Sequence, residues 1–254
     1  MLFRNFEVAL FDLGGTLIYF DGERPDIIAE SDWAMQDWLE KAGYRLPQDF
    51  GARFTGRVSA FLAGGDPDFI EITSSYFLKI LLAEAGYPSV PDQVVHTALK
   101  VKFAISQEHW KLEDDAITTL ESLKRHGLRM GLVSNAGDTQ DVETLIDKHR
   151  LRPYFEQVVI SAQVGIRKPN PGIFQLALDH FKTAPENVAM VGDTLGADIL
   201  GAQNAGIASI WITRRAERSD NRAHEDTIRP DAVIASLSEL PPLLFQADSL
   251  RDSS

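Results

Sequence analysis

The stretch that most constrains the fold of this chain is V-A-L-F-D-L-G-G-T-L, residues 8–17. Four apolar residues bounded by a glycine-rich loop are typical of a short buried strand. An unpaired charge inside such a strand is costly, so we expect Asp12 at its carboxyl end. Open α/β sheets bind their ligands at that edge. The stretch therefore predicts a sheet strand that carries one carboxylate toward a ligand site, and a capped turn without function is the alternative interpretation.

From residue 113 onward, short apolar runs alternate with helical patterns, which predicts a parallel sheet with right-handed crossovers. The predicted strands are 129–134, 157–161, 188–191, 208–212 and 232–234. The predicted helices are 114–126, 138–149, 171–180, 195–205 and 238–245. Residues 214–229 are predicted to form a charged, turn-like connection.

A mostly helical block interrupts this pattern directly after the first strand. Residues 18–25 are predicted to form a turn, and helices are expected at 26–42, 49–62, 67–85 and 91–110. We therefore predict an α/β fold in which a Rossmann-like parallel sheet core carries an inserted, mostly helical cap domain. The predicted boundaries are 1–20 and 111–245 for the core, 21–110 for the cap and 246–254 for a C-terminal tail.

Composition excludes several classes of protein. The net charge of −12, from 25 Lys and Arg against 37 Asp and Glu, argues against nucleic-acid binding, which uses a basic face. No apolar run is long enough for a membrane span, and the N-terminus lacks the apolar region of a signal peptide. The absence of cysteine excludes disulfides, thiol catalysis and cysteine-ligated zinc. A cytoplasmic enzyme, monomeric or homodimeric, is the expectation.

Three further stretches place polar side chains after predicted strands, at the sheet edge expected for Asp12. They contribute Ser134, Lys168 within G-I-R-K-P, and Asp193 with Asp198 within G-D-T-L-G-A-D. This set suits phosphoryl transfer. Two of the carboxylates, Asp12 and Asp193, are hard oxygen ligands for Mg²⁺, while a lysine and a hydroxyl can bind phosphoryl oxygens. A carboxylate can also act as the nucleophile and form an aspartyl-phosphate.

In this order, the four stretches resemble the four motifs of the haloacid dehalogenase (HAD) superfamily of phosphohydrolases. The helical block lies where members of subfamily I carry their C1-type cap. The resemblance implies that Asp12 is the nucleophile and a Mg²⁺ ligand. Asp193 would be the second carboxylate ligand. Asp198 would hold a metal-bound water or orient Lys168, and is counted with the metal residues.

The same resemblance implies roles for the residues around the phosphoryl group. Lys168 would offset the negative charge between Asp12 and the phosphate. Ser134 would hydrogen-bond the phosphoryl oxygens, with Asn135 beside it. Thr16 would support the first loop and is counted among the substrate-binding residues.

Gly14 departs from the family's usual first motif, D-x-D-G-T, in which the second Asp is the general acid-base. Family members use the backbone carbonyl of this position as a Mg²⁺ ligand, and Gly14 retains one. Nucleophile and metal site are therefore expected to survive without the proton shuttle. Loss of a positioned acid-base typically costs roughly 10² to 10⁴-fold in rate.

Three consequences of this loss are open. The enzyme acts on phosphates whose leaving group needs little protonation, a cap residue supplies the proton, or the protein is a slow or inactive relative that binds phosphate. Some HAD branches also replace this Asp. A dehalogenase is disfavoured because dehalogenases need no Mg²⁺, and a phosphonatase requires a cap lysine, for which the candidates are Lys79, Lys100 and Lys102.

The sequence thus predicts a Mg²⁺-dependent phosphatase of a small phosphorylated metabolite, acting through an aspartyl-phosphate on Asp12. The alternatives are a phosphate-binding or regulatory pseudo-enzyme and, less favoured, a phosphonatase-type hydrolase that cleaves a C–P bond. Neither a nucleic acid nor a membrane is expected as a partner.

Overall fold

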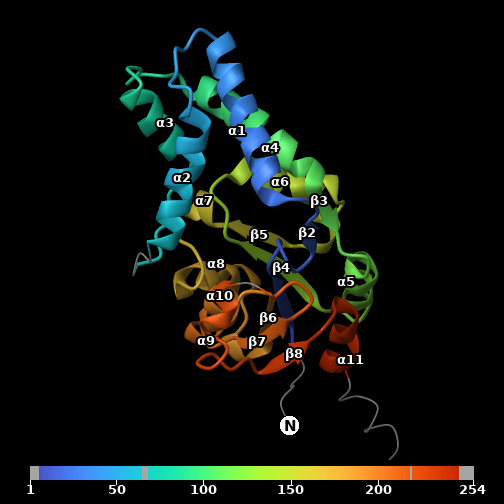
Figure 1. Cartoon of the computed structure of the whole chain (residues 1–254). Coiled ribbons are helices and arrows are strands. Elements are labelled where there is room, and N and C mark those ends of the chain that lie inside the picture. Colours follow the sequence, from blue (N-terminus) through green and yellow to red (C-terminus); the bar gives the residue numbers. More distant parts are fainter. Residues whose placement is uncertain (1–5, 65–67, 218, 246–254) are drawn as a thin grey trace, which may run out of the picture.

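A six-stranded parallel sheet forms the centre of the protein (Figure 1). The computed structural model describes residues 6–64, 68–217 and 219–245. The strand order is β5-β4-β1-β6-β7-β8, so the sheet grows outward from β1 in both directions. The strands are β1 (Val8–Phe11), β4 (Arg129–Ser134), β5 (Gln157–Ile160), β6 (Val188–Gly192), β7 (Ala208–Ile212) and β8 (Ala232–Ile234). The predicted α/β fold with a parallel sheet is confirmed.

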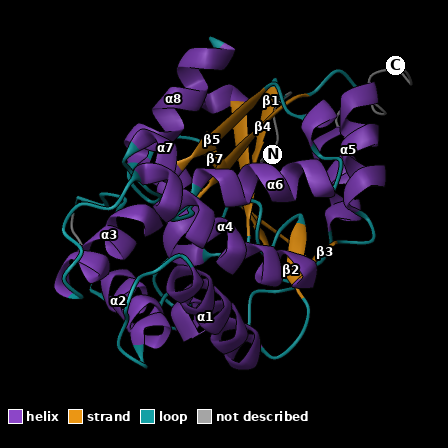
Figure 2. Cartoon of the chain, turned by 90° about the horizontal axis from the view of Figure 1, so that it is seen from above, coloured by secondary structure: helices purple, strands orange, loops and turns teal. Residues whose placement is uncertain are grey.

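Each strand alternates between two hydrophobic layers, as the pleat requires. In β1, Ala9 and Phe11 face one layer, while Val8 and Leu10 face the other. The first layer is completed by α5 (Ala116–Arg125), α6 (Thr139–Lys148) and α11 (Leu240–Phe245). The second is completed by α8 (Pro171–Phe181) and α9 (Leu200–Asn204). Helices thus cover both faces, with α5 and α8 on opposite sides of the strands in Figure 2.

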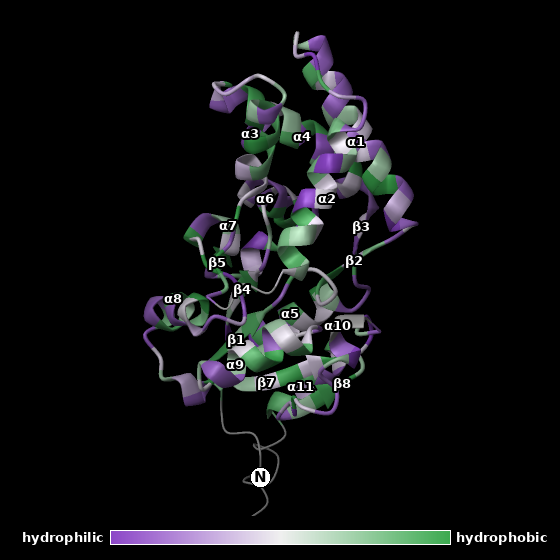
Figure 3. Cartoon of the chain, turned by 60° about the vertical axis from the view of Figure 1, so that its left-hand side comes forward, coloured by the Kyte–Doolittle hydropathy of each residue, from purple (hydrophilic) through white to green (hydrophobic). Residues whose placement is uncertain are grey.

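Four helices form a separate module above the carboxyl edge of the sheet (Figure 1). They are α1 (Arg24–Lys41), α2 (Phe50–Ala63), α3 (Ser74–Glu84) and α4 (Asp92–His109). Hydrophilic and hydrophobic stretches alternate along these helices (Figure 3), and their apolar faces enclose a hydrophobic cluster of their own around Met35, Phe54 and Leu78. The division of the chain into core and cap domains remains our prediction, and we call these four helices the helical module.

An antiparallel ribbon joins the helical module to the sheet at both chain crossings. It pairs β2 (Ile18–Phe20) with β3 (Trp110–Leu112), with Phe20 opposite Trp110. The sequence predicted a turn and a helix end here, and that was wrong. The ribbon has only three residues on each strand, and its two strands lie far apart in the chain, so local periodicity does not reveal it.

Other helices differ from the sequence prediction in their boundaries. The helix expected at 67–85 begins only at Ser74, because Thr73 accepts a hydrogen bond from the Tyr76 amide as N-cap and Ile70 forms a β-bridge with Ile166. The helix expected at 195–205 is a π-helical turn (Leu195–Ile199) followed by α9. Residues 65–67 and the predicted tail, 246–254, lie outside the described residues.

Short helical segments occupy several connections. They are η1 (Arg152–Tyr154), α7 (Ser161–Val164), η2 (Pro185–Asn187), α10 (Ser219–Arg222) and η4 (Leu237–Glu239). Among the residues that the structure describes, no helix combines the length and the apolar character that crossing a membrane requires.

A buried ion pair lies inside the helical module. The Lys102 ammonium on α4 donates to the Asp32 carboxylate and, at 3.1 Å, to the Ser31 hydroxyl of α1. Thr55 of α2 donates to the same Asp32 oxygen at 2.9 Å. Burial lowers the pKa of Lys102, although the Asp32 charge opposes this shift. The ion pair and its hydrogen bonds therefore link α1, α2 and α4, and each buried charge is stabilised by the opposite charge of its partner.

We predict that Lys102→Met lowers the free energy of unfolding by about 3–5 kcal/mol, because Asp32 would stay buried without its cation. The double variant Asp32→Leu with Lys102→Met should recover most of this loss, since an apolar pair replaces both charges. Urea denaturation followed by circular dichroism measures the difference. Equal stability of the single and double variants would contradict a required charge pairing.

Candidate active site

The sheet topology brings the predicted site residues to one edge. Asp12 follows β1, Ser134 is the last residue of β4, and Asp193 follows β6. These three strands are neighbours, with β1 in the middle. Because parallel strands end on the same side, the three side chains meet at the carboxyl edge, beside the point where the strand order reverses.

Lys168 connects two of the carboxylates from a loop between α7 and α8. Its Nζ lies 2.7 Å from Asp12 Oδ1 and 2.7 Å from Asp198 Oδ1. It also donates to the Val133 carbonyl at 2.6 Å, and its side chain is buried. Burial alone would lower the pKa of Lys168, but the two carboxylates outweigh it and raise the pKa to about 12. The lysine is therefore a permanent cation inside the site.

Asp12, Asp193 and Asp198 form a buried acidic cluster in which one oxygen from each lies within 4.8 Å of the others. With Lys168 as the cation that pairs with Asp12 and Asp198, the cluster carries two more negative charges than positive ones. Burial, helped by the Asp12 charge, raises the pKa of Asp198, and the Lys168 ammonium opposes this shift. A divalent cation would balance the cluster, and carboxylate oxygens are the ligands that Mg²⁺ prefers.

The two oxygens of Asp198 are directed to protein groups. Oδ1 faces the Lys168 ammonium, and Oδ2 accepts a hydrogen bond from the Thr194 amide at 2.9 Å. This geometry suits orientation of Lys168 better than direct ligation of a metal. Asp12 and Asp193 are then the carboxylates best suited to direct ligation.

Two glycines allow the carboxylates to approach so closely. A Cβ atom on Gly15, whose φ is +97°, would lie 2.3 Å from Asp193 Oδ2. A Cβ atom on Gly192 would lie 2.3 Å from Asp198 Cγ. Positions 15 and 192 therefore require glycine, because any side chain there would collide with Asp193 or Asp198.

Three of the residues assigned to substrate binding differ in their surroundings. Ser134 lines the cleft beside Asp12. The side chain of Asn135 also lines it, but its amide donates to the Lys168 carbonyl at 2.9 Å and accepts from the Lys168 amide at 2.8 Å. Asn135 thus fixes the backbone of the lysine loop. Thr16 is fully buried, and its hydroxyl has no hydrogen-bond partner among the described residues, so its role remains a prediction.

Asn221 is a positioning residue that the sequence analysis missed. Its side chain is fully buried and donates to the Asp193 carbonyl at 2.8 Å, while accepting from the Leu195 amide at 2.7 Å. Trp211 Nε1 donates to the same carbonyl at 3.0 Å. These bonds fix the loop that carries Asp193. Asn221 falls in the segment predicted to be a charged connection, where no local pattern marks it.

A cleft of about 820 Å³ opens above Asp12, between the sheet edge and the helical module. Gly14 lies on its floor, where a Cβ atom would be 3.1 Å from Cη2 of Trp110. The indole of Trp110 therefore covers the space into which a side chain at position 14 would extend. Tyr19 and Phe20 of the ribbon and Leu62 of α2 also line the cleft.

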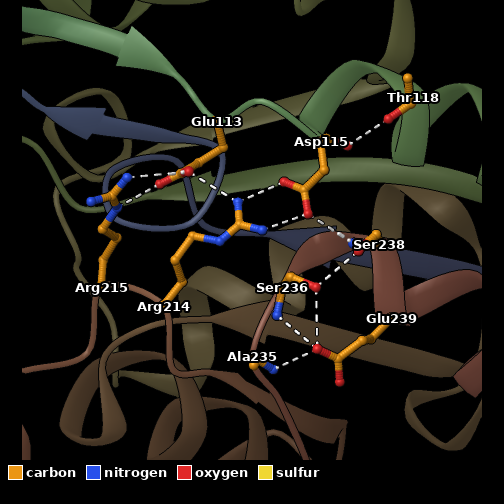
Figure 4. Close-up of polar contacts among 9 residues, drawn as sticks. All are labelled: Glu113, Asp115, Thr118, Arg214, Arg215, Ala235, Ser236, Ser238 and Glu239. Carbon is orange, nitrogen blue, oxygen red and sulfur yellow. Dashed lines mark hydrogen bonds and ion pairs between the residues drawn. The ribbon is translucent and has the colours of Figure 1, made fainter.

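An ion-pair network holds Arg215, one of the residues that line the cleft (Figure 4). Arg215, which lines the cleft, donates to Glu113 at 2.8 Å and lies 4.0 Å above the Tyr19 ring. Arg214 bridges Glu113 and Asp115, with 2.7 Å to each oxygen of Asp115. Partial burial acts to raise the pKa of Asp115, but the bonds from Arg214 outweigh it and lower the pKa.

The helical module also contacts the loops of the site directly. The Ser74 amide donates to the Gly137 carbonyl at 2.7 Å, and Ser161 donates to Glu71 at 2.7 Å. Gln107 of α4 donates to Asp141 of α6 at 2.8 Å. Burial raises the pKa of Asp141 to about 6, which makes it the cleft carboxylate with the most shifted titration outside the acidic cluster.

The three lysines considered for phosphonatase chemistry do not line the cleft. Lys79 pairs with Asp92 at 2.7 Å on the surface, and Lys102 is the buried partner of Asp32. Lys100 lines a separate groove between α4 and α6. The geometry therefore gives no support to Schiff-base chemistry from these residues.

The sequence profile of the haloacid dehalogenase-like hydrolases matches residues 6–206, which include all four motifs. The chain belongs to the haloacid dehalogenase-like hydrolase family. The Pyrococcus furiosus glyceraldehyde 3-phosphate phosphatase is 39% identical over 95% of this chain and 92% of the relative. The Thermus thermophilus phosphoserine phosphatase is 30% identical over 84% of this chain and 78% of the relative.

Solved structures of the family share the fold. The 2-haloacid dehalogenase from Pseudomonas syringae pv. Tomato DC3000 superposes with a TM-score of 0.70 at 27% identity, covering 95% of this chain and 99% of that one. The relatives of this hydrolase thus include both phosphatases and a dehalogenase.

We predict that Gly15→Ala destabilises this hydrolase more than Gly127→Ala does. Both glycines have positive φ, +97° and +80°, so each alanine should cost about 1–3 kcal/mol in backbone strain. Only at Gly15 would the new Cβ also collide with Asp193, since nothing lies within 4 Å at Gly127. Thermal unfolding of both variants gives the comparison, and equal losses would show that Asp193 moves aside at no cost.

Proposed function

We propose that this protein is a Mg²⁺-dependent phosphatase that hydrolyses a small phosphorylated metabolite through an aspartyl-phosphate on Asp12. The observation that carries the proposal is the position of Asp12 at the floor of the cleft. It lies within 4.8 Å of two further carboxylates and 2.7 Å from a permanent cation, Lys168. A carboxylate in such surroundings can approach a phosphate dianion only if cations offset the charge of both.

The residues around Asp12 divide this task. Between Asp12 and Asp193, with the Gly14 carbonyl as a third ligand, Mg²⁺ would supply the positive charge that a transferring phosphoryl group needs. Lys168 would neutralise the remaining charge between Asp12 and the phosphoryl oxygens. Ser134, at the end of the neighbouring strand, would donate a hydrogen bond to one of those oxygens.

The named relatives support a phosphatase rather than a dehalogenase. The two relatives with the sequence coverage given above are both named phosphatases. Dehalogenation is the second reaction to consider, because a 2-haloacid dehalogenase shares the fold. The Asp193 carboxylate argues against a dehalogenase. Together with Asp12 and Asp198 it could bind a divalent cation, whereas without a cation it would repel an anionic haloacid. Release of chloride from 2-chloropropionate would favour the dehalogenase.

A phosphate-binding pseudo-enzyme is the alternative that Gly14 favours. It predicts Mg²⁺ and phosphate binding with no turnover of any phosphate ester. The nucleophile, the lysine and the acidic cluster are all present, and a pseudo-enzyme would not need to retain them together.

We predict that Asp12→Asn lowers the rate of phosphate release from 4-nitrophenyl phosphate by about 10⁴-fold or more, because the nucleophile is lost. The 4-nitrophenolate leaving group of this substrate departs without a proton, so the assay does not depend on an acid at position 14. Asp114→Asn is the matched control, since this carboxylate is exposed and lies outside the cleft. Activity retained by Asp12→Asn would contradict the proposal, and a silent wild type that still binds Mg²⁺ would favour the pseudo-enzyme.

We further predict that Mg²⁺ stabilises the wild type, by about 2.7 kcal/mol at a concentration one hundred times its Kd. Asp193→Asn should lose this effect. Without Mg²⁺ the same variant should unfold at a higher temperature than the wild type, because one repelling carboxylate has been removed from the cluster. Thermal unfolding with and without Mg²⁺ measures both effects. Equal stabilisation of wild type and variant would exclude Asp193 as a ligand.

A further inference from the structure

Trp110 occupies the side of the cleft where the family's general acid would stand. A Cβ atom at position 14 would lie 3.1 Å and 3.4 Å from two ring carbons of Trp110. The indole is held in place from the ribbon, edge-on to Phe20 with ring centres 5.4 Å apart. The Arg24 guanidinium lies 5.8 Å from the same indole. The indole, with the Arg24 guanidinium beside it, therefore fills the space into which a side chain at position 14 would extend.

The lost acid matters most for poor leaving groups. An alkoxide is strongly basic, and its departure needs a proton that a positioned acid would supply at roughly 10² to 10⁴-fold advantage. A phenolate, with a pKa of about 10 for an unsubstituted phenol such as the Tyr side chain, departs far more readily without one. The chemistry of Gly14 thus selects leaving groups that are stable as anions.

The aromatic residues that line the cleft also favour an aryl leaving group. Tyr19, Phe20 and Trp110 of the ribbon line the same cleft as Asp12, and of these three Trp110 is the one that lies against Gly14. A planar aromatic leaving group can pack against such a ring in the offset-stacked or edge-to-face geometry that aromatic pairs prefer. Leaving-group chemistry and cleft shape therefore favour one class of substrate.

We propose that the substrates of this site are aryl phosphate monoesters, and that Trp110 is the residue that determines this specificity by contacting the aryl group. The proposal rests on the phosphatase function proposed above. It concerns the leaving group, whereas the phosphoryl site would be common to all substrates.

The reaction then balances without an acid from the protein. A carboxylate oxygen of Asp12 attacks phosphorus, the bond from phosphorus to the aryl oxygen breaks, and its electron pair leaves with the phenolate. In the second step a water oxygen attacks phosphorus and the bond to Asp12 breaks. This step restores the carboxylate and yields hydrogen phosphate and one proton released to water. Because no carboxylate at position 14 takes up that proton, the second step should limit turnover and the phenolate should appear in a burst.

Three substrates separate the two effects of the site. Phenyl phosphate has the ring and an aryl leaving group, benzyl phosphate has the ring but an alkoxide leaving group, and acetyl phosphate has a stabilised leaving group without a ring. We expect the wild type to favour phenyl over benzyl phosphate by at least about 10²-fold in kcat/KM. 4-Nitrophenyl phosphate should give a burst that approaches one phenolate per active site.

Variants at the two positions test the assignment. Trp110→Leu should raise KM for phenyl phosphate and leave acetyl phosphate nearly unchanged, while Trp110→Phe should restore the phenyl phosphate value. The double variant Gly14→Asp with Trp110→Ala supplies a carboxylate and the space for it. It should raise kcat/KM for benzyl phosphate by about 10²-fold relative to Trp110→Ala alone. Thermal unfolding verifies that each variant is folded.

Asp141 also lines the cleft, and burial raises its pKa to about 6, so it is a candidate proton donor whose removal can contradict the proposal. We expect Asp141→Asn to leave the ratio of phenyl to benzyl phosphate turnover unchanged. Equal wild-type turnover of both substrates would overturn the aryl proposal while leaving the phosphatase function intact. If Asp141→Asn then removed benzyl phosphate activity alone, Asp141 would be the acid. No release of phosphate from any of the esters or from acetyl phosphate would overturn the phosphatase function, and the aryl proposal with it.

Discussion

The Lys168 ammonium, buried between Asp12 and Asp198, is the interaction on which the rest of the site depends. Asp12 belongs to the first of the four motifs and Asp198 to the last. Without a cation between the two carboxylates, their burial would be strongly unfavourable. Asn135 holds the backbone of Lys168 through two hydrogen bonds, and therefore fixes the cation relative to β4. The fold thus holds a buried cluster with two more negative charges than positive ones, which a divalent cation would balance.

Steric freedom at two glycines makes this charge density possible. Gly15 and Gly192 leave space that the carboxylates of Asp193 and Asp198 fill. Asn221 and Trp211 then hold the loop of Asp193 from the far side. On the sheet side, hydrogen bonds therefore hold the charged groups in place, as the proposed phosphoryl chemistry requires. On the other side, the ribbon places aromatic side chains against the cleft.

The proposed choice of leaving group depends on the ribbon that connects the sheet to the helical module. Trp110 and Phe20 lie where the chain passes between the sheet and the helical module. Trp110 faces Gly14, a position that carries no side chain, and Phe20 packs against Trp110. The network of Glu113, Arg214 and Arg215 fixes the neighbouring crossing (Figure 4). The residues that we propose to select the leaving group therefore belong to the connection between the two parts, and the charges that we propose for catalysis lie at the carboxyl edge of the sheet.

Much of this arrangement could be predicted from the sequence because it depends on local patterns. Apolar runs followed by Asp12, Ser134 and Asp193 predict strands that end at one edge, and the sheet confirms the parallel fold. The ribbon could not be predicted, since its three-residue strands pair across the whole helical module. The contact of Trp110 with Gly14 and the bonds of Asn221 to the Asp193 loop are equally non-local. The two bonds from the Asn135 side chain to the backbone of Lys168 are also non-local, and the predicted role of Asn135 in substrate binding stays a prediction.

The most direct test of the central claim is to find the covalent intermediate. The protein is mixed with 4-nitrophenyl phosphate and Mg²⁺, quenched in acid within the first turnover, digested, and examined for peptides that gained the mass of one phosphoryl group. We expect a single modified peptide, residues around Asp12, with an occupancy that approaches one per chain because the hydrolysis step lacks its base. Release of phosphate with no modified peptide at any time, or modification at another residue, would show that Asp12 is not the nucleophile.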